Sequence, residues 1–150
     1  MNIKDEFNEA TERIREGLEN PRKYNPNIPY QNPNYMLSYA YAHRGTIYLR
    51  SGHFYEAIRD FSSGISLLPS PNRLEEIYKE RDEKFEYSVK SMLGPQLHED
   101  EEKWIEQIYV AIGCTLFDQR GLAYQKSGEL EKAKSDYRVF LKMKPQWDKS

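Results

Sequence analysis

The chain has 150 residues, a length at which a single domain buries roughly 70% of the surface that its unfolded form exposes. Hydrophobic residues make up 38% of it and aromatic residues 13%, which is too much for a disordered chain. A net charge of −2 gives no electrostatic reason to expect a nucleic-acid partner, because phosphate binding relies on clustered Lys and Arg. We therefore expect one globular domain that does not bind nucleic acid.

A single cysteine, Cys114, excludes an internal disulfide and a cysteine-rich zinc site, and it favours a reducing compartment. No run of 18 apolar residues suggests a membrane span. Acidic and basic side chains are mixed into residues 1–20, unlike in a signal peptide. We expect a cytoplasmic protein without membrane contact.

Apolar residues at helical spacing predict an N-terminal helix within residues 1–20, followed by a Pro- and Asn-rich loop at 21–34. Residues 35–50 and 54–68 are predicted to form a helical hairpin, since Ser-Gly separates them and prolines follow. A further helix is expected from 73 to 93, before a Gly-Pro pair.

The C-terminal part of the chain is also predicted to be helical. Residues 98–126 fit either one long helix or two, because Gly113 and Gly121 interrupt their apolar pattern. A last helix is expected over 130–143, before Pro145. The predicted fold class is therefore all-α, with about six or seven helices.

Residues 41–61 and 117–137 match each other at a common offset of 76 residues. The matched pairs are Arg44/Arg120, Gly45/Gly121, Tyr48/Tyr124, Ser51/Ser127, Gly52/Gly128, Ala57/Ala133, Asp60/Asp136, Phe61/Tyr137 and Pro69/Pro145. This agreement indicates an internal repeat.

The glycines of this repeat predict its packing. A glycine inside a helix costs about 1 kcal/mol relative to alanine, so its recurrence as Gly45 and Gly121 implies a packing role. We predict that these glycines face Ala57 and Ala133 across their hairpins and let the paired helices approach closely. At the turns, Gly52 and Gly128 supply a permissive backbone. The stems of Arg44 and Arg120, which precede the packing glycines, are interpreted as covering the hairpins.

The order of a large residue, a small residue, Tyr, Gly, Ala, an aromatic residue and a closing Pro resembles the tetratricopeptide repeat, a helix-turn-helix unit of 34 residues. The resemblance places units at 38–71 and 114–147. The interval 72–113 lacks the signature and is expected to form a degenerate helix pair. Residues 7–18 are similar to 54–65, so the first helix resembles the second helix of a repeat. The resemblance implies one domain, a short right-handed α-solenoid of antiparallel helix pairs.

In this family the first helices of the pairs line a concave groove that binds a peptide or a helix of a partner. The resemblance thus implies a non-enzymatic protein-interaction module or scaffold. The corresponding groove positions are Tyr39, Ala42, Thr46 and Leu49 in the first unit and Thr115, Asp118, Leu122 and Gln125 in the second. Coverage of this groove by Tyr24, Ile28 and Tyr30 of the Pro-rich loop is an alternative.

One subfamily binds the acidic C-termini of chaperones through Lys, Asn and Arg on these faces. The candidate places here are Ala42, Thr46, Thr115, Asp118 and Gln119. The resemblance therefore does not extend to that clamp, and chaperone-tail binding is not expected.

Other patterns favour structural interpretations. The acidic run at 98–102 suits a helix start, His43 and His53 lack the further ligands of a zinc site, and an inert buried Cys114 is favoured over a catalytic triad. No Gly-rich phosphate loop, HExxH or GxSxG motif occurs. We predict no catalytic residue, no cofactor and no metal.

Two alternative functions are left open by the sequence. One is a helical enzyme or accessory subunit that uses the polar residues of the atypical 72–113 segment. The other is self-association through the end helix near Phe140. Residues 73–106 carry eleven acidic and six basic side chains, whereas 120–149 carry eight basic and four acidic ones. Such an asymmetry is typical of a solvated surface, and the alternatives are steering of a partner and head-to-tail association.

Overall fold

The structure, a computed structural model, describes residues 2–19, 35–80 and 97–143, with side chains from 105 onward in the last range. These residues form α1 (Ile3–Glu19), α2 (Tyr35–Arg50), α3 (Phe54–Ile65), α4 (Pro71–Lys79), α6 (Leu97–Lys126) and α7 (Leu130–Lys142), and no strand. The all-α prediction is confirmed. None of these helices combines the length and the apolar character needed to cross a membrane.

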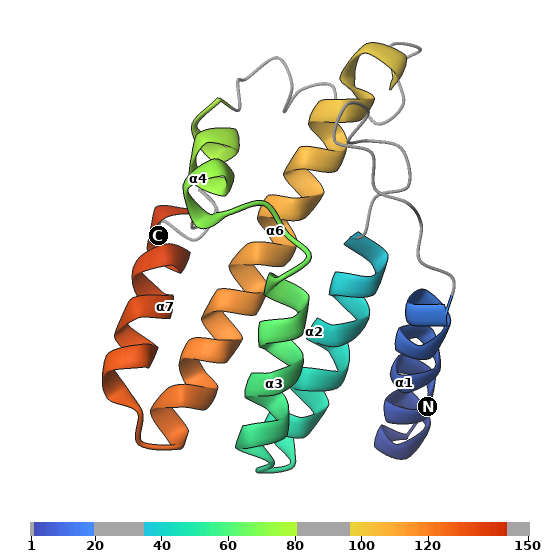
Figure 1. The fold of residues 1–150 in the computed structure, drawn as a ribbon, viewed down its shortest axis with the longest axis vertical. Helices are drawn as coiled ribbons and strands as arrows, with labels where there is room; N and C mark the ends of the chain where they lie inside the picture. The colour runs from blue at the N-terminus through green and yellow to red at the C-terminus, as the bar shows by residue number, and fades with distance from the viewer. Residues whose placement is uncertain (1, 20–34, 81–96, 144–150) are drawn as a thin grey trace.

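Five of the helices lie side by side in a row, with α1 at one end and α7 at the other (Figure 1). In this row α1 packs on α2, α2 on α3, α3 on α6 and α6 on α7, and α2 also contacts α6. We call the hairpin α2–α3 unit 1, and we call the second half of α6 together with α7 unit 2. The two units are therefore stacked directly on each other, and α4 packs against the first half of α6.

Both hairpins turn through a glycine with positive φ, at +80° for Gly52 and +88° for Gly128. In unit 1 the His53 amide donates to the carbonyl of Tyr48 at 2.9 Å, and the Gly52 amide donates to the carbonyl of Leu49 at 3.1 Å. The same two bonds recur after α6. This pattern is the Schellman motif, which requires a left-handed residue at the glycine position. The predicted role of both turn glycines is confirmed.

The end of α3 differs slightly from the prediction. The helix ends at Ile65 instead of Leu68. The amides of Leu67 and Leu68 bond to carbonyls three residues back, at 3.2 and 3.0 Å. These bonds form a tighter turn that ends the helix before the prolines.

The open question about residues 98–126 is settled by a single continuous helix of 30 residues, α6. Gly113 and Gly121 lie within this helix, at places where the side chain of a neighbouring helix packs closely against it. A Cβ on Gly113 would approach Leu74 to 3.1 Å, and one on Gly121 would approach the ring of Tyr137 to 2.7 Å. These glycines permit close packing of α4 and α7 on α6.

Helix α4 begins at Pro71, one residue before the interval that lacks the repeat signature. Ser70 caps it by accepting a hydrogen bond from the Arg73 amide at 3.2 Å, and Pro71 occupies its first turn. The described part of this helix ends at Lys79, and the rest of the helix expected over 73–93 lies outside the described residues. The degenerate pair expected at 72–113 stays a prediction, although α6 continues through residue 113 without a break. The loop at 21–34 also lies outside the described residues.

Two buried clusters hold these helices together. The first joins both units through Ala42, Leu49, Ala57, Phe61, Ile112, Leu116 and Ala123. The second joins α4 to α6 and to the end of α7 through Leu74, Ile77, Ile105, Tyr109, Val110, Cys114, Phe117 and Met143. The apolar faces of α6 are therefore buried along both halves of its length, by α3 and α7 on one part and by α4 on the other.

Candidate protein-interaction surface

A glycine meets an aromatic ring within each repeat unit. A Cβ on Gly45 would lie 2.6 Å from the Phe61 ring, and one on Gly121 would lie 2.7 Å from the Tyr137 ring. The nearest atoms belong to the ring four residues after the predicted alanine, and Ala57 is itself fully buried. The predicted contact between glycine and alanine stays a prediction. Long helical side chains lean toward the N-terminus of their helix, so each ring covers the turn before it and reaches the glycine.

A buried ion pair recurs in both units. In unit 1 the guanidinium of Arg44 donates to both oxygens of Asp60, at 2.7 and 2.8 Å. In unit 2 Arg120 makes the same bidentate pair with Asp136, at 2.7 Å for each bond. Only 1% of Asp60 is exposed, so its charge depends on this partner. In both units the sequence places the arginine sixteen positions before the aspartate, and this repeated spacing is a signal for the ion pair. The interpretation of the arginines as stems that cover the hairpins did not use it.

Each of these arginines also reaches the preceding helix of the row. Arg44 Nη1 lies 3.5 Å from Thr11 Oγ1 of α1, and Arg120 Nη1 donates to Ser62 Oγ of α3 at 3.1 Å. The hydrogen bond to Asp60 raises the pKa of Arg44. For Arg120, burial opposes the charged form, but the bond and charge of Asp136 raise its pKa overall. These contacts link α2 and α6, the first helices of the units, each to the helix that precedes it in the row. The resemblance of α1 to the second helix of a repeat stays a prediction.

The predicted groove residues of α2 divide into two groups. Tyr39 is 53% exposed, and Thr46 is half-buried with its hydroxyl donating to the carbonyl of Ala42 at 2.8 Å. Ala42 and Leu49 are only 5% and 8% exposed, because they belong to the cluster that α2, α3 and α6 share. We therefore leave Ala42 and Leu49 out of the surface considered below.

On α6 the predicted residues are more open. Thr115 and Gln125 are exposed, whereas Asp118 and Leu122 are half-buried. The hydroxyl of Tyr137 donates to Gln125 Oε1 at 3.1 Å. Burial, followed by the charges of Asp118 and Asp136, raises the pKa of Tyr137. The α6 residues thus present hydrogen-bonding groups beside one apolar side chain.

Two residues of the exposed stripe of α2 were missed. Met36 is 57% exposed, three positions before Tyr39, and the ring of His43 lies 6.4 Å from that of Tyr39. Residues at these spacings share one helix face. Met36 was missed because the repeat frame was started at residue 38, and His43 because it was weighed only as a metal ligand.

The two helices contact each other, and their stripes occupy equivalent positions at the repeat offset, so we group them as one candidate surface. We call it the α2–α6 surface and define it by Met36, Tyr39, His43, Thr46, Thr115, Asp118, Leu122 and Gln125. Its α2 part is mainly apolar and aromatic, and its α6 part is mainly polar. Basic side chains, Arg50 and Lys126, follow at equivalent exposed positions where the two helices end.

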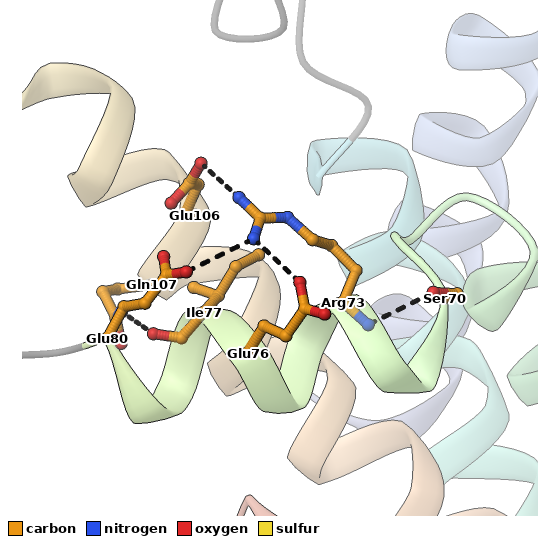
Figure 2. Close-up of polar contacts among 7 residues, drawn as sticks. All are labelled: Ser70, Arg73, Glu76, Ile77, Glu80, Glu106 and Gln107. Carbon is orange, nitrogen blue, oxygen red and sulfur yellow. Dashed lines mark hydrogen bonds and ion pairs between the residues drawn. The ribbon is translucent and has the colours of Figure 1, made fainter.

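The polar residues of the atypical segment hold α4 on α6 (Figure 2). Arg73 interacts with three carboxylates, those of Glu76 (3.2 Å), Glu80 (3.7 Å) and Glu106 (3.5 Å). Gln107 Nε2 of α6 donates to the carbonyl of Ile77 in the last turn of α4 at 3.3 Å. In the described part of this segment, these groups are engaged in docking one helix on another.

Cys114 also has a structural contact. Its thiol lies 2.9 Å from the carbonyl of Met143 at the end of α7. At the equivalent position of unit 1, the hydroxyl of Ser38 donates to the carbonyl of Gly64 at 2.9 Å. Both side chains thus tie a first helix to the end of its second helix. Within the described ranges, no group of three His, Cys, Asp or Glu side chains is arranged to hold a metal ion.

Comparison with known families supports the repeat assignment. Residues 115–146, which comprise most of unit 2, match the family profile described as Tetratricopeptide repeat. Neither the comparison with curated proteins nor the comparison with solved structures gave a significant match.

Proposed function

We propose that the chain is a non-enzymatic tetratricopeptide-repeat module that binds a peptide or helix of another protein on the α2–α6 surface, which the family match of residues 115–146 supports. Domains of this family generally mediate protein–protein interactions. The proposal assigns the binding to the first helices of the units. It also places the protein in the cytoplasm, which its single cysteine supports.

The observation that carries the proposal is the exposure of large apolar side chains on the first helix of unit 1. Tyr39 and Met36 leave 53% and 57% of their surfaces in solvent, one turn apart on the same face. Tyr and Met are enriched in protein interfaces, where each buries a large apolar area. A partner residue that packs on this pair would remove both from water.

The neighbouring helix supplies the polar part of the contact. Thr115, Gln125 and Asp118 offer a hydroxyl, an amide and a carboxylate on the adjoining face of α6. A partner segment therefore needs an apolar anchor for Tyr39 and Met36, followed by groups that hydrogen-bond to α6. The α2–α6 surface holds Thr and Asp where chaperone-binding relatives hold cationic residues, so a densely acidic segment would lack counter-charges there.

Two exposed tyrosines of unit 1 allow a matched test. Tyr39 lies on α2 and Tyr55, 82% exposed, lies on α3. Each would be changed to alanine, and the proteins captured from native cell extract would be quantified by mass spectrometry. We expect Tyr39→Ala to reduce capture of specific partners about tenfold, as loss of an interface aromatic does. Tyr55→Ala should capture like the wild type.

Both substitutions affect exposed side chains, so the free energy of unfolding of each variant should stay within about 0.5 kcal/mol of the wild-type value. Thermal denaturation would verify this. Equal capture by the Tyr39→Ala and wild-type proteins would contradict the proposal. Loss of the same partners in Tyr55→Ala would instead move the binding site to the second helices.

A further inference from the structure

The two end helices of the row have complementary outer faces. Helices α1 and α7 lie at opposite ends (Figure 1), where each packs on its neighbour, α2 or α6. Their outward sides show what the ends of the row can contact.

The outer side of α7 keeps apolar residues at positions that are covered in unit 1. Phe54, Ile58 and Ile65 of α3 are partly buried against the cluster that includes α6 residues. Their counterparts at the repeat offset are Leu130, Lys134 and Leu141. Leu130 and Leu141 are 56% and 64% exposed, so both leave most of their apolar surface in water. The face therefore retains two apolar contacts and gains a positive charge between them.

A second substitution on α7 decides which partner this face accepts. In unit 1 Ser62 accepts a hydrogen bond from Arg120 of the following unit. Its counterpart in unit 2 is the exposed Arg138, which cannot accept a hydrogen bond and repels another arginine. A further repeat of the same kind is disfavoured there, whereas an acidic surface is attracted. We call Leu130, Lys134, Arg138 and Leu141 the α7 end face.

The outer side of α1 is acidic. Five of its six carboxylates recur at alternating spacings of four and three, which places them on one helix face: Asp5, Glu9, Glu12, Glu16 and Glu19. This face lies opposite the buried Ala10 and Ile14. Arg13 pairs with Glu9, and Arg15 pairs with Glu12 and Glu19, but the helix as a whole has six acidic and three basic residues, so a negative charge is left over. We call these five residues the α1 acidic face.

We propose that a second copy of this chain docks head to tail, with the α7 end face of one copy on the α1 acidic face of the next. Lys134 and Arg138 would meet carboxylates such as Glu12 and Glu16, while Leu130 and Leu141 cover the aliphatic stems of the facing side chains. The two faces are different and lie at opposite ends, so the contact is heterologous and extends into linear assemblies. Such assemblies would repeat the α2–α6 surface along their length and raise avidity for multivalent partners.

The experiment uses the full chain in analytical ultracentrifugation at about 0.05 and about 0.5 M NaCl, because screening weakens contacts between exposed charges. The wild type should show a mass that rises with protein concentration and falls with salt. Two charge-reversed variants, Lys134→Glu/Arg138→Glu and Glu12→Lys/Glu16→Lys, should each associate at least about tenfold more weakly. All changed side chains are exposed, and circular dichroism would verify their folding.

Mixing the two variants gives the sharpest test. Each variant keeps one unaltered face, and in the mixture the two unaltered faces are complementary in charge, as are the two reversed faces. The mixture should therefore recover the association that each variant alone has lost, with every contact formed between one copy of each variant. Lys132→Glu changes the same charge on a different side of α7 and should assemble like the wild type.

Three results would overturn the proposal. The wild type could stay monomeric at every concentration, in which case the α7 end face serves another protein or none. The Glu12→Lys/Glu16→Lys variant could assemble like the wild type, which would exclude α1 as the occupant. The mixture of the two variants could fail to associate although both are folded. None of these results depends on partner binding at the α2–α6 surface.

Discussion

Units 1 and 2 share their internal contacts but differ where each meets its surroundings. Both contain the bidentate Arg–Asp pair, the glycine against an aromatic ring and the turn with positive φ. The differing positions include Ala42/Asp118, Leu49/Gln125, Ile58/Lys134, Phe61/Tyr137 and Ser62/Arg138, where unit 1 is the less polar member, whereas Thr46/Leu122 and Ser63/Val139 differ in the opposite sense. Unit 1 lies between α1 and unit 2, whereas unit 2 ends the row. Residues that make contacts within a unit are the same or similar in both units, whereas the identity of the other residues depends on which neighbours the unit has in the row.

The largest expected effect concerns the contact that both units share. Arg44→Met and Arg120→Met should each lower the free energy of unfolding by about 3–5 kcal/mol, since each leaves a buried carboxylate without its partner. We expect Arg120→Met to be the more severe, because it also removes the 3.1 Å bond to Ser62 that links the units. Urea unfolding would measure both. A loss below about 1 kcal/mol in either variant would contradict the buried pair.

An exchange of residues between equivalent positions tests the difference between the units. Leu49→Gln places the residue of unit 2 into the shared cluster and should cost about 2–4 kcal/mol, from lost apolar burial and a desolvated amide. The reverse exchange, Gln125→Leu, affects an exposed side chain and should change stability by no more than about 0.5 kcal/mol. Similar costs for the two exchanges would mean that both positions have the same environment.

The packing glycines should also respond unequally. A Cβ on Gly45 meets the fully buried ring of Phe61, which has no room to move, so Gly45→Ala should destabilise by about 1–2 kcal/mol despite the helix-forming tendency of alanine. Tyr137 is half-buried and can shift outward, so Gly121→Ala should be close to neutral. Thermal denaturation would compare them. A larger loss in Gly121→Ala would reverse the order that ring burial predicts.

The smallest effect is a pH dependence confined to unit 2. Burial and nearby carboxylates raise the pKa of Tyr137, so folding favours its neutral phenol. This contribution is complete below the unfolded phenol pKa of about 10 and is lost as pH rises through the higher folded value. Tyr137→Phe, which copies Phe61 of unit 1, should therefore reduce the fall in melting temperature above pH of about 10. Identical alkaline profiles for both proteins would contradict the assigned shift.

Much of this fold followed from local patterns in the sequence. The helix over 35–50, the turn glycines and the offset of 76 residues were all readable, because helical spacing and positive-φ glycines leave direct signals. The exposure of Tyr39, Thr115 and Gln125 agrees with the faces that the repeat register assigned to them. Their role in binding stays a prediction that the variants above test.

The tertiary structure decided which side chains meet across helices. The sequence did not show that Phe61 would lie over Gly45, because this contact depends on how the ring leans toward the N-terminus of α3. Ala42 and Leu49 shared the register of the exposed stripe, yet the packing of α6 on α2 buried them. Which residues share one face of a helix follows from the hydrogen bonds within that helix, so it can be predicted from the local sequence. Burial depends on the neighbouring helix, whose position is fixed by contacts distant in the chain, such as that of Arg120 with Ser62.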